Sequence, residues 1–201
     1  FEGVYRREFG DSKTLTRPAG IAVTDVNGQR RAYVVDTGGV STADHRVVAF
    51  DATDGRRLFE FGTRGTKDGE FNLPRDVAVA PTGELYVVDG GNFRVQVFDA
   101  DGKFVRAFGD VGRQGGQFSR PKELAVAPDG NVYVVDAAFG NFQIFAPDGR
   151  LLLDVGYRSN VDRPAGFMLP AGIAIDVDGR VYVADQYFRK IEIFAIEPNA
   201  K

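Results

Sequence analysis

Four aspartates recur in one sequence context and could together bind a cation. Each of them ends a Tyr-Val-x-Asp motif, and they are Asp36, Asp89, Asp136 and Asp185. Carboxylate oxygens are hard ligands suited to calcium, so a ring of four would suggest a metal site. A basic residue follows three of the four motifs, however, and Asn141 stands at that place in the third. We therefore expect no metal site but structural ion pairs that fix the next loop: Asp36 with Arg46, Asp89 with Arg94, and Asp185 with Lys190.

The chain lacks the residues that most other catalytic and metal sites require. The chain has no cysteine, which excludes disulfides, thiolate metal sites and cysteine nucleophiles. His45 is the single histidine, so neither a histidine-rich metal site nor a relay of histidines can form. It lies in an inserted loop, and we interpret it as incidental, with a lone metal ligand or contact residue as the alternative. The Asp99-x-Asp101 and Asp176-x-Asp178 segments resemble calcium loops but lack the closing glutamate, and are expected to be turns. The sequence predicts no catalytic residue and no cofactor.

The four motifs belong to a larger unit that repeats at roughly 50 residues. Each unit begins with a proline and a short apolar stretch, continues with the Tyr-Val-x-Asp motif, and then has an aliphatic segment ending in phenylalanine. In the first three units a further segment runs into glycine. The four starting segments follow Pro18, Pro74, Pro121 and Pro170.

These segments have the composition and length of β-strands, rich in Val, Ile, Tyr and Phe. They are joined by turns such as Pro-Asp-Gly, and no stretch shows the apolar spacing of a surface helix. Four short antiparallel strands repeated in this way predict an all-β fold, a β-propeller, with a stacked solenoid as the alternative. We expect a single domain over 1–201, with units at approximately 11–62, 63–109, 110–156, and 157–201 plus 1–10.

The repeat resembles the NHL repeat. The similar features are Pro-x-x-Ile-Ala-Val, Tyr-Val-x-Asp and Asn-x-Arg-Val-Gln-Val-Phe-Asp, most completely in the unit from Asn72 to Phe98. The resemblance implies four-stranded NHL-type blades, usually six per propeller, whereas this chain holds four. It therefore leaves two alternatives, a four-bladed closed ring or part of a six-bladed propeller.

The end segments favour closure as four blades. The last unit stops after its third strand, near Phe194, whereas Arg7-Glu-Phe-Gly10 matches the fourth strand of earlier units. We expect Val4–Phe9 to pair with Ile191–Phe194, which would cover two sheet edges that otherwise invite association.

One face of such a propeller carries the longer connections, where binding residues usually lie. We call it the long-loop face, made of the loops that enter each unit and those between its second and third strands. The entering loops hold eight basic residues against five acidic ones, and four aromatic residues lie in the other loops. The candidate binding residues are Lys13, Arg17, Arg64, Lys67, Phe93, Arg113, Arg120, Phe139, Arg158, Arg163, Tyr187 and Phe188. The alternatives are a merely solvated face for the charges and packing between blades for the aromatics.

The composition narrows the partner class. The formal net charge of the 201 residues is −3, which gives no general attraction to nucleic acid, and no apolar run approaches a membrane span. We expect a non-enzymatic scaffold that binds another protein, with an anionic ligand or glycan as further possibilities. The resemblance to exported bacterial members favours a periplasmic or extracellular location in a multi-component assembly. The alternatives are a metal-dependent hydrolase or lyase propeller, and an RNA-binding NHL domain.

Overall fold

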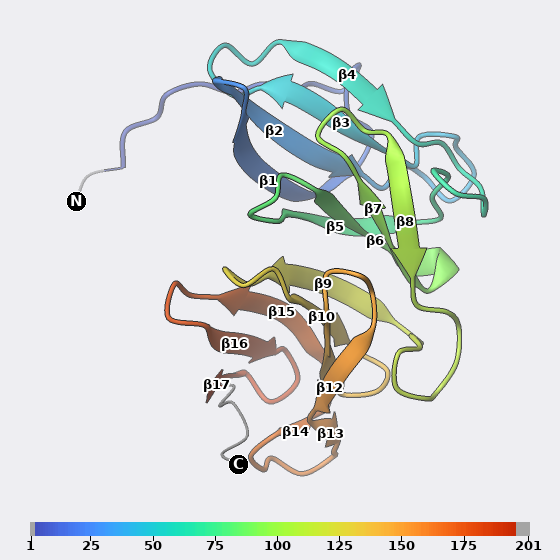
Figure 1. Ribbon diagram of the computed structural model, residues 1–201, viewed down its shortest axis with the longest axis vertical. Helices are drawn as coiled ribbons and strands as arrows, with labels where there is room; N and C mark the ends of the chain where they lie inside the picture. Colours follow the sequence, from blue (N-terminus) through green and yellow to red (C-terminus); the bar gives the residue numbers. More distant parts are fainter. Residues whose placement is uncertain (1–2, 196–201) are drawn as a thin grey trace.

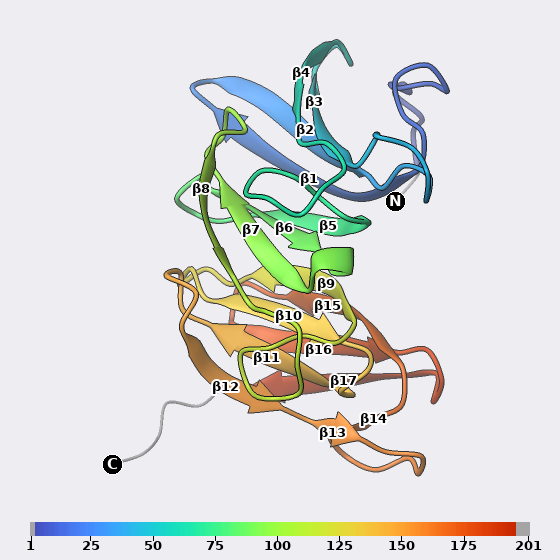
Figure 2. The same ribbon diagram turned by 90° about the vertical axis from the view of Figure 1, so that its right-hand side faces the viewer.

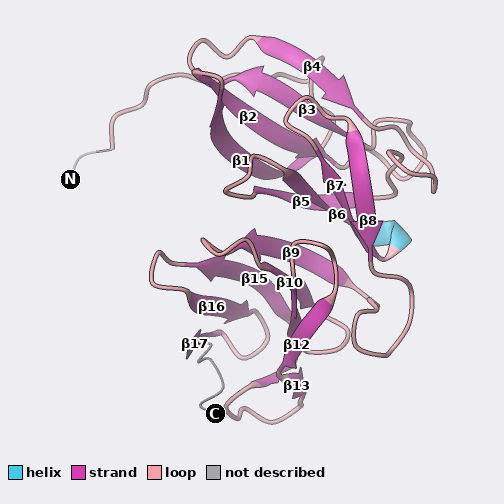
Figure 3. Ribbon diagram, in the orientation of Figure 1, coloured by secondary structure: helices cyan, strands magenta, loops and turns pink. Residues whose placement is uncertain are grey.

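Four antiparallel sheets, the blades, make up the chain in the computed structural model, which describes residues 3–195 (Figures 1 and 3). The described residues contain a single helical turn, η1 (Gly90–Asn92), and no helix of the length and hydropathy needed to cross a bilayer. The all-β prediction is confirmed.

Each blade is a meander in which consecutive strands pair. Blade 1 consists of β1 (Pro18–Val26), β2 (Gln29–Asp36), β3 (Arg46–Asp51) and β4 (Arg57–Phe61). Blade 2 consists of β5 (Pro74–Val79), β6 (Leu85–Asp89), β7 (Arg94–Phe98) and β8 (Phe104–Phe108). Blade 3 consists of β9 (Pro121–Val126), β10 (Val132–Asp136), β11 (Asn141–Phe145) and β12 (Leu151–Val155). Blade 4 has three described strands, β15 (Pro170–Ile175), β16 (Arg180–Asp185) and β17 (Lys190–Ala195).

The cores lie between consecutive blades. Both faces of β6 and β10 are buried along the whole strand, because each is packed between two neighbouring sheets; this explains their continuous apolar sequence. Tyrosine hydroxyls also connect the blades: Tyr33 donates to the carbonyl of Ala100 at 2.6 Å, and Tyr86 to that of Pro147 at 3.3 Å.

The long loops that enter blades 2, 3 and 4 share one construction. In each loop a phenylalanine lies three residues before the starting proline. Its backbone pairs in parallel with a residue near the beginning of the same loop. In the last of these loops the bridge is the strand pair β13 (Tyr157–Arg158) and β14 (Gly166–Phe167). The three phenylalanines have no exposed surface, and they are Phe71, Phe118 and Phe167.

The blades follow one another in an arc. The innermost strands pack in the order β1, β5, β9, β15, and blades 1 and 4 lie at opposite ends of the arc (Figures 1 and 2). Apolar side chains at these ends remain in solvent: Ile21 and Val23 are 57% and 55% exposed, and Ile191 and Ile193 are 68% and 60% exposed.

The expected pairing of Val4–Phe9 with Ile191–Phe194 is wrong. Residues 3–10 form no strand, and among the described residues β17 has no partner on its outer edge. Phe9 lies instead on blade 1, with its ring 5.2 Å from that of Phe50. The physical reason is that four blades span an arc, which keeps the two segments at its separate ends.

Candidate functional site

The aspartates of the four motifs lie at the long-loop face and anchor the loops that enter each blade. Asp36 accepts the backbone N–H groups of Thr16 and Arg17, and Asp136 accepts those of Ser119 and Arg120. The carboxylates of all four aspartates are buried, and their oxygens are occupied by such donors. This arrangement is structural, and it holds the backbones of Arg17 and Arg120 in place.

Burial and hydrogen bonding act in opposite directions on these carboxyl groups. Burial raises the pKa of Asp89, although Asn72, Asn92 and Arg94 donate to it. At Asp185 burial also acts to raise the pKa, but backbone N–H groups, including those of Phe188 and Met168, outweigh it and lower the pKa below its ordinary value.

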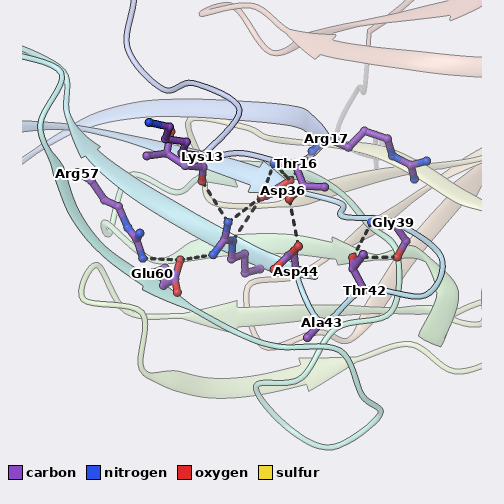
Figure 4. A network of polar contacts seen from close by, with 12 residues as sticks. Lys13, Thr16, Arg17, Asp36, Gly39, Thr42, Ala43, Asp44, Arg57 and Glu60 are labelled. Atoms are coloured by element: carbon purple, nitrogen blue, oxygen red, sulfur yellow. Dashed lines mark hydrogen bonds and ion pairs between the residues drawn. The ribbon is translucent and has the colours of Figure 1, made fainter.

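Two of the three expected ion pairs form. Arg46 lies 3.3 Å from Asp36, and Arg94 lies 2.9 Å from Asp89. Figure 4 shows the network around Asp36, which extends to Glu60 and Arg57, while the Arg17 side chain points away from Asp36.

The expected pair of Asp185 with Lys190 is wrong. The Lys190 ammonium lies 2.8 Å from Asp162 and 2.7 Å from Glu192. Because Asp185 already accepts four backbone N–H groups, it needs no cation, and Lys190 closes the entering loop instead.

Four cations gather where the innermost strands of blades 1, 2 and 3 begin. Arg17 precedes β1, Arg75 is the second residue of β5, and Arg120 and Lys122 flank the first residue of β9. None of the four forms an ion pair with any residue in the described part of the chain. We call them the axial cations.

The axial cations lie within electrostatic reach of one another. Burial lowers the pKa of Arg75, and the charges of Arg17 and Arg120 lower it further. Burial likewise lowers the pKa of Lys122, with Arg120 and Arg75 adding to the effect and Glu123 opposing it. Repulsion between unneutralised like charges would be relieved by a bound anion. Arg17 and Arg120 were predicted; Arg75 and Lys122 were missed, although each directly follows a strand-starting proline.

Two carboxylates beside the axis connect neighbouring blades. Asp76 of β5 accepts the N–H of Leu124 in β9 at 3.1 Å. Burial raises the pKa of Asp76 to about 6, against the lowering effect of the N–H groups of Leu124 and Val77. Burial also raises the pKa of Glu123, against the lowering effect of the nearby N–H of Ile173. The described residues contain no group of three or more potential metal ligands.

The remaining predicted cations are spread over the entering loops rather than brought together. Arg158 donates weakly to the carbonyls of Ala137 and Ala138 at 3.4 and 3.3 Å. The others are exposed and form no ion pairs with described residues, and they are Lys13, Arg64, Lys67, Arg113 and Arg163.

The predicted aromatics separate into two groups. Phe93 packs against the core between blades 2 and 3, and Phe139 is half-buried. Tyr187 is 59% exposed and meets the Phe188 ring edge-on at 5.2 Å, while the Lys190 ammonium lies 5.3 Å above Phe188. Of the four aromatic residues only Tyr187 is exposed, and the other three are half-buried.

His45 is a buried connector, which differs from its interpretation as an incidental loop residue. Its Nδ1 accepts the N–H of Leu73 at 3.2 Å, so its Nε2 carries the proton and donates to the carbonyl of Gly39 at 3.0 Å. It therefore joins the inserted loop of blade 1 to the loop that enters blade 2, and it is fully enclosed.

The opposite end of the axis is lined mainly by apolar residues, with Thr24 and Asp176 among them. A hollow there is lined by the ends of all four innermost strands, including Val23, Val79, Val126 and Ile175. The charged groups beside the axis are thus concentrated towards the long-loop face.

Comparison with known proteins identifies the repeat. Residues 71–98 match the NHL repeat. The chain is 32% identical over 104 residues to human NHL repeat-containing protein 3, a match that covers 46% of this chain and 30% of the relative. The chain thus spans less than a third of the length of that relative.

Solved structures show the same fold at low identity. A Bacteroides thetaiotaomicron protein of unknown function superposes with a TM-score of 0.63 at 24% identity, over 85% of this chain and 42% of its own. A putative gluconolactonase superposes with a TM-score of 0.64 at 16% identity, over 93% of this chain and 62% of its own. At these identities the likeness concerns the fold alone.

Proposed function

The chain belongs to the NHL-repeat family, and we propose that it is a non-enzymatic binding scaffold whose long-loop face docks an acidic stretch of another protein. The observation that carries the proposal is the group of axial cations, Arg17, Arg75, Arg120 and Lys122, which lie together without an ion pair among the described residues. Arg17, Arg75 and Arg120 are exposed and Lys122 is half-buried, so a partner can reach all four. A partner carboxylate would neutralise what the chain itself leaves unneutralised.

The surroundings of the axial cations favour a binding role. The backbones of Arg17 and Arg120 are held by the buried carboxylates of Asp36 and Asp136, so the strands present these side chains from fixed positions. Little conformational entropy is then lost by the backbone on binding. The scattered loop cations would add long-range attraction that guides an acidic partner to this face.

An acidic protein segment fits better than a nucleic acid. The formal charge of the whole chain is −3, which repels a long polyanion outside the immediate contact. A short acidic stretch meets only the local cations. The Tyr187–Phe188 pair gives the same face an apolar contact for the side chains that flank such a stretch.

The test is charge reversal on each end of the molecule. A fluorescein-labelled poly-glutamate peptide is titrated with the protein and followed by anisotropy at low and high salt. The variant R17E/R75E/R120E should bind at least tenfold more weakly, because each substitution removes an attraction and adds a repulsion. The matched control R56E/K103E/R150E makes the same change of charge in exposed turns between third and fourth strands, and should alter affinity less than twofold.

Three results would overturn the proposal. Equal losses in the two variants would show a nonspecific charge effect. Tighter binding of single-stranded RNA than of the peptide, with a steep salt dependence, would support nucleic-acid binding instead. Turnover of a lactone or ester that depends on Asp76 or Glu123 would support an enzyme.

A further inference from the structure

A basic side chain closes the loop that enters blade 2 and the loop that enters blade 4. Arg94 Nη2 donates to two backbone carbonyls of its loop, at 2.6 and 3.0 Å. Lys190 Nζ donates to two backbone carbonyls of its own loop, at 3.0 and 3.2 Å. These carbonyls belong to Lys67 and Glu70 in blade 2 and to Arg163 and Gly166 in blade 4. In both loops, two carbonyl oxygens three residues apart thus receive one positive charge.

The loop that enters blade 3 has the same backbone arrangement. The N–H of Gln117 donates to the carbonyl of Gln114 at 3.0 Å, and the corresponding bonds of the other two loops are also 3.0 Å long. Gln143 holds this loop, because its Nε2 donates to the Gln117 carbonyl at 2.8 Å and its Oε1 accepts the N–H of Gly116 at 2.7 Å. In blade 2, Gln96 makes the same two contacts at 2.7 and 2.9 Å. The carbonyls of Gln114 and Gln117 therefore lie as those of the other loops do.

Asn141 stands at the position of this basic residue in blade 3. The three positions are equivalent, because each residue pairs with the aspartate of its own Tyr-Val-x-Asp motif. The side chain of asparagine is shorter than that of lysine or arginine, and no basic side chain of the described residues bonds to the carbonyls of Gln114 or Gln117. The Oδ1 of Asn141 is itself buried without a hydrogen-bond partner. Three oxygen atoms of blade 3 therefore lack the positive charge that blades 2 and 4 supply from their own side chains.

The charges at this place favour a monovalent cation. The buried carboxylate of Asp136 forms no ion pair with any described residue, so one negative charge is left to neutralise. In blade 4, Glu192 lies 2.7 Å from the Lys190 ammonium, whereas the equivalent residue of blade 3 is the neutral Gln143. Calcium takes about six to eight oxygen ligands with several carboxylates among them, which is more charge than Asp136 provides.

The spacing of the oxygens fits an ion of the size of potassium. Four oxygens surround the Lys190 ammonium at 2.7–3.2 Å from Nζ, and a potassium ion is close to an ammonium group in size. Carbonyl oxygens can also replace the hydration shell of potassium. We propose that blade 3 binds a monovalent cation of this size through the carbonyls of Gln114 and Gln117 and the amide oxygen of Asn141.

The bound ion closes the loop that enters blade 3, as Arg94 and Lys190 close theirs, and its charge neutralises Asp136. Protein atoms cover the Oδ1 of Asn141, so the amide must turn to bring this oxygen onto the ion. The turn is favourable, because a buried acceptor without a donor costs free energy. The folded chain should therefore be more stable in potassium than in a cation too large to enter the loop.

Thermal unfolding in the chloride salts of potassium, sodium and choline, at one ionic strength, tests the site. Potassium should raise the melting temperature above its value in choline by about 3–6 °C at a concentration tenfold above the dissociation constant, and sodium should raise it less. The variant N141K supplies an ammonium group from the chain and should melt at the same temperature in all three salts. The matched control N160K makes the same exchange at an exposed asparagine in the loop that enters blade 4, and should keep the full potassium effect.

Calorimetric titration of the folded chain with potassium chloride gives a second measurement, and N141A, which removes the amide without adding a charge, gives a second variant. The unaltered chain should show one site, N141K none, and N141A binding that is at least tenfold weaker. Equal melting temperatures in the three salts, equal effects of sodium and potassium, a potassium effect that persists in full in N141K or N141A, or its loss in N160K would overturn the proposal.

Discussion

At the scale of single residues, the carboxyl group of Asp76 illustrates how a side chain can join blades at a cost in stability. Its oxygen accepts the N–H of Leu124, but burial raises its pKa to about 6. The folded state therefore binds a proton more tightly than the unfolded state, and stability falls as pH rises from about 4 to about 6.

We expect D76N to remove this dependence. Asparagine keeps an acceptor for the Leu124 N–H without a buried charge. Stability at pH 7 should rise, by at most about 3 kcal/mol for a shift of about two pKa units. Urea unfolding, followed by circular dichroism at several pH values, measures the free energy of unfolding. The variant Asp154→Asn, at an exposed position, is the control. A D76N stability curve parallel to that of the unaltered chain would contradict the prediction.

Gly20 and Gly172 occupy equivalent places in β1 and β15 but differ in space. A β-carbon at Gly20 would lie 2.7 Å from the Asp76 α-carbon, whereas at Gly172 it would lie 3.5 Å from Ala184 and Glu123. G20A should therefore lose about 1–3 kcal/mol through forced separation of β1 and β5. G172A should be nearly neutral, and thermal unfolding of the two variants compares them. Equal losses of stability in G20A and G172A would mean that β1 and β5 can move apart without cost, and would contradict the prediction.

The sequence repeats predicted the residues that form the same contact in successive units. They did not predict residues whose contact partners are distant in sequence. The ion pairs of Asp36 and Asp89 lie within one hairpin region, so spacing revealed them. Lys190 bonds to Asp162 across the entering loop, a contact that no local spacing encodes. Arg75 and Lys122 were missed because their proximity depends on how β5 and β9 pack around the axis.

At the scale of elements, the entering loops are parts of the core as well as of the binding face. The buried phenylalanine of each loop bridges its own loop and also fills the space between two blades; Phe118 belongs to the cluster between blades 2 and 3. The strands and their order were predictable from alternation and turns. These two-residue bridges were not, because they are too short to leave a pattern.

F118A should cost about 3–5 kcal/mol, the usual range for truncating a fully buried phenylalanine. It should also weaken peptide binding, because the loop between β8 and β9 holds Arg120 in place. F139A, at a half-buried position between the second and third strands of blade 3, is the control and should cost less. Denaturant unfolding and peptide anisotropy provide the two measurements. If F118A lost stability but kept its full affinity for the peptide, the loop would not be needed to position the binding residues.

At the scale of the whole molecule, blades 2 and 3 each have a neighbouring blade on both sides. Blades 1 and 4 each have a neighbouring blade on one side only. Stability in repeat folds is approximately a sum of units and neighbour contacts, so the terminal blades should open first. We expect amide hydrogen exchange, measured by mass spectrometry at low protein concentration, to be slowest in β6, β7, β10 and β11 and fastest in β17. Uniform protection across the blades would instead indicate one cooperative unit.

The tyrosine hydroxyls that cross between blades give the molecule an optical reporter of its own assembly. The chain has no tryptophan and seven tyrosines, so tyrosine dominates its near-ultraviolet absorbance. Burial raises the pKa of Tyr33, Tyr86 and Tyr133 above the ordinary value. In an alkaline titration these three phenols should ionise late, in a step that coincides with loss of β-sheet ellipticity, because a phenolate cannot remain enclosed between two blades. The ultraviolet absorbance of tyrosinate would then report, without any label, the pH at which the blades separate.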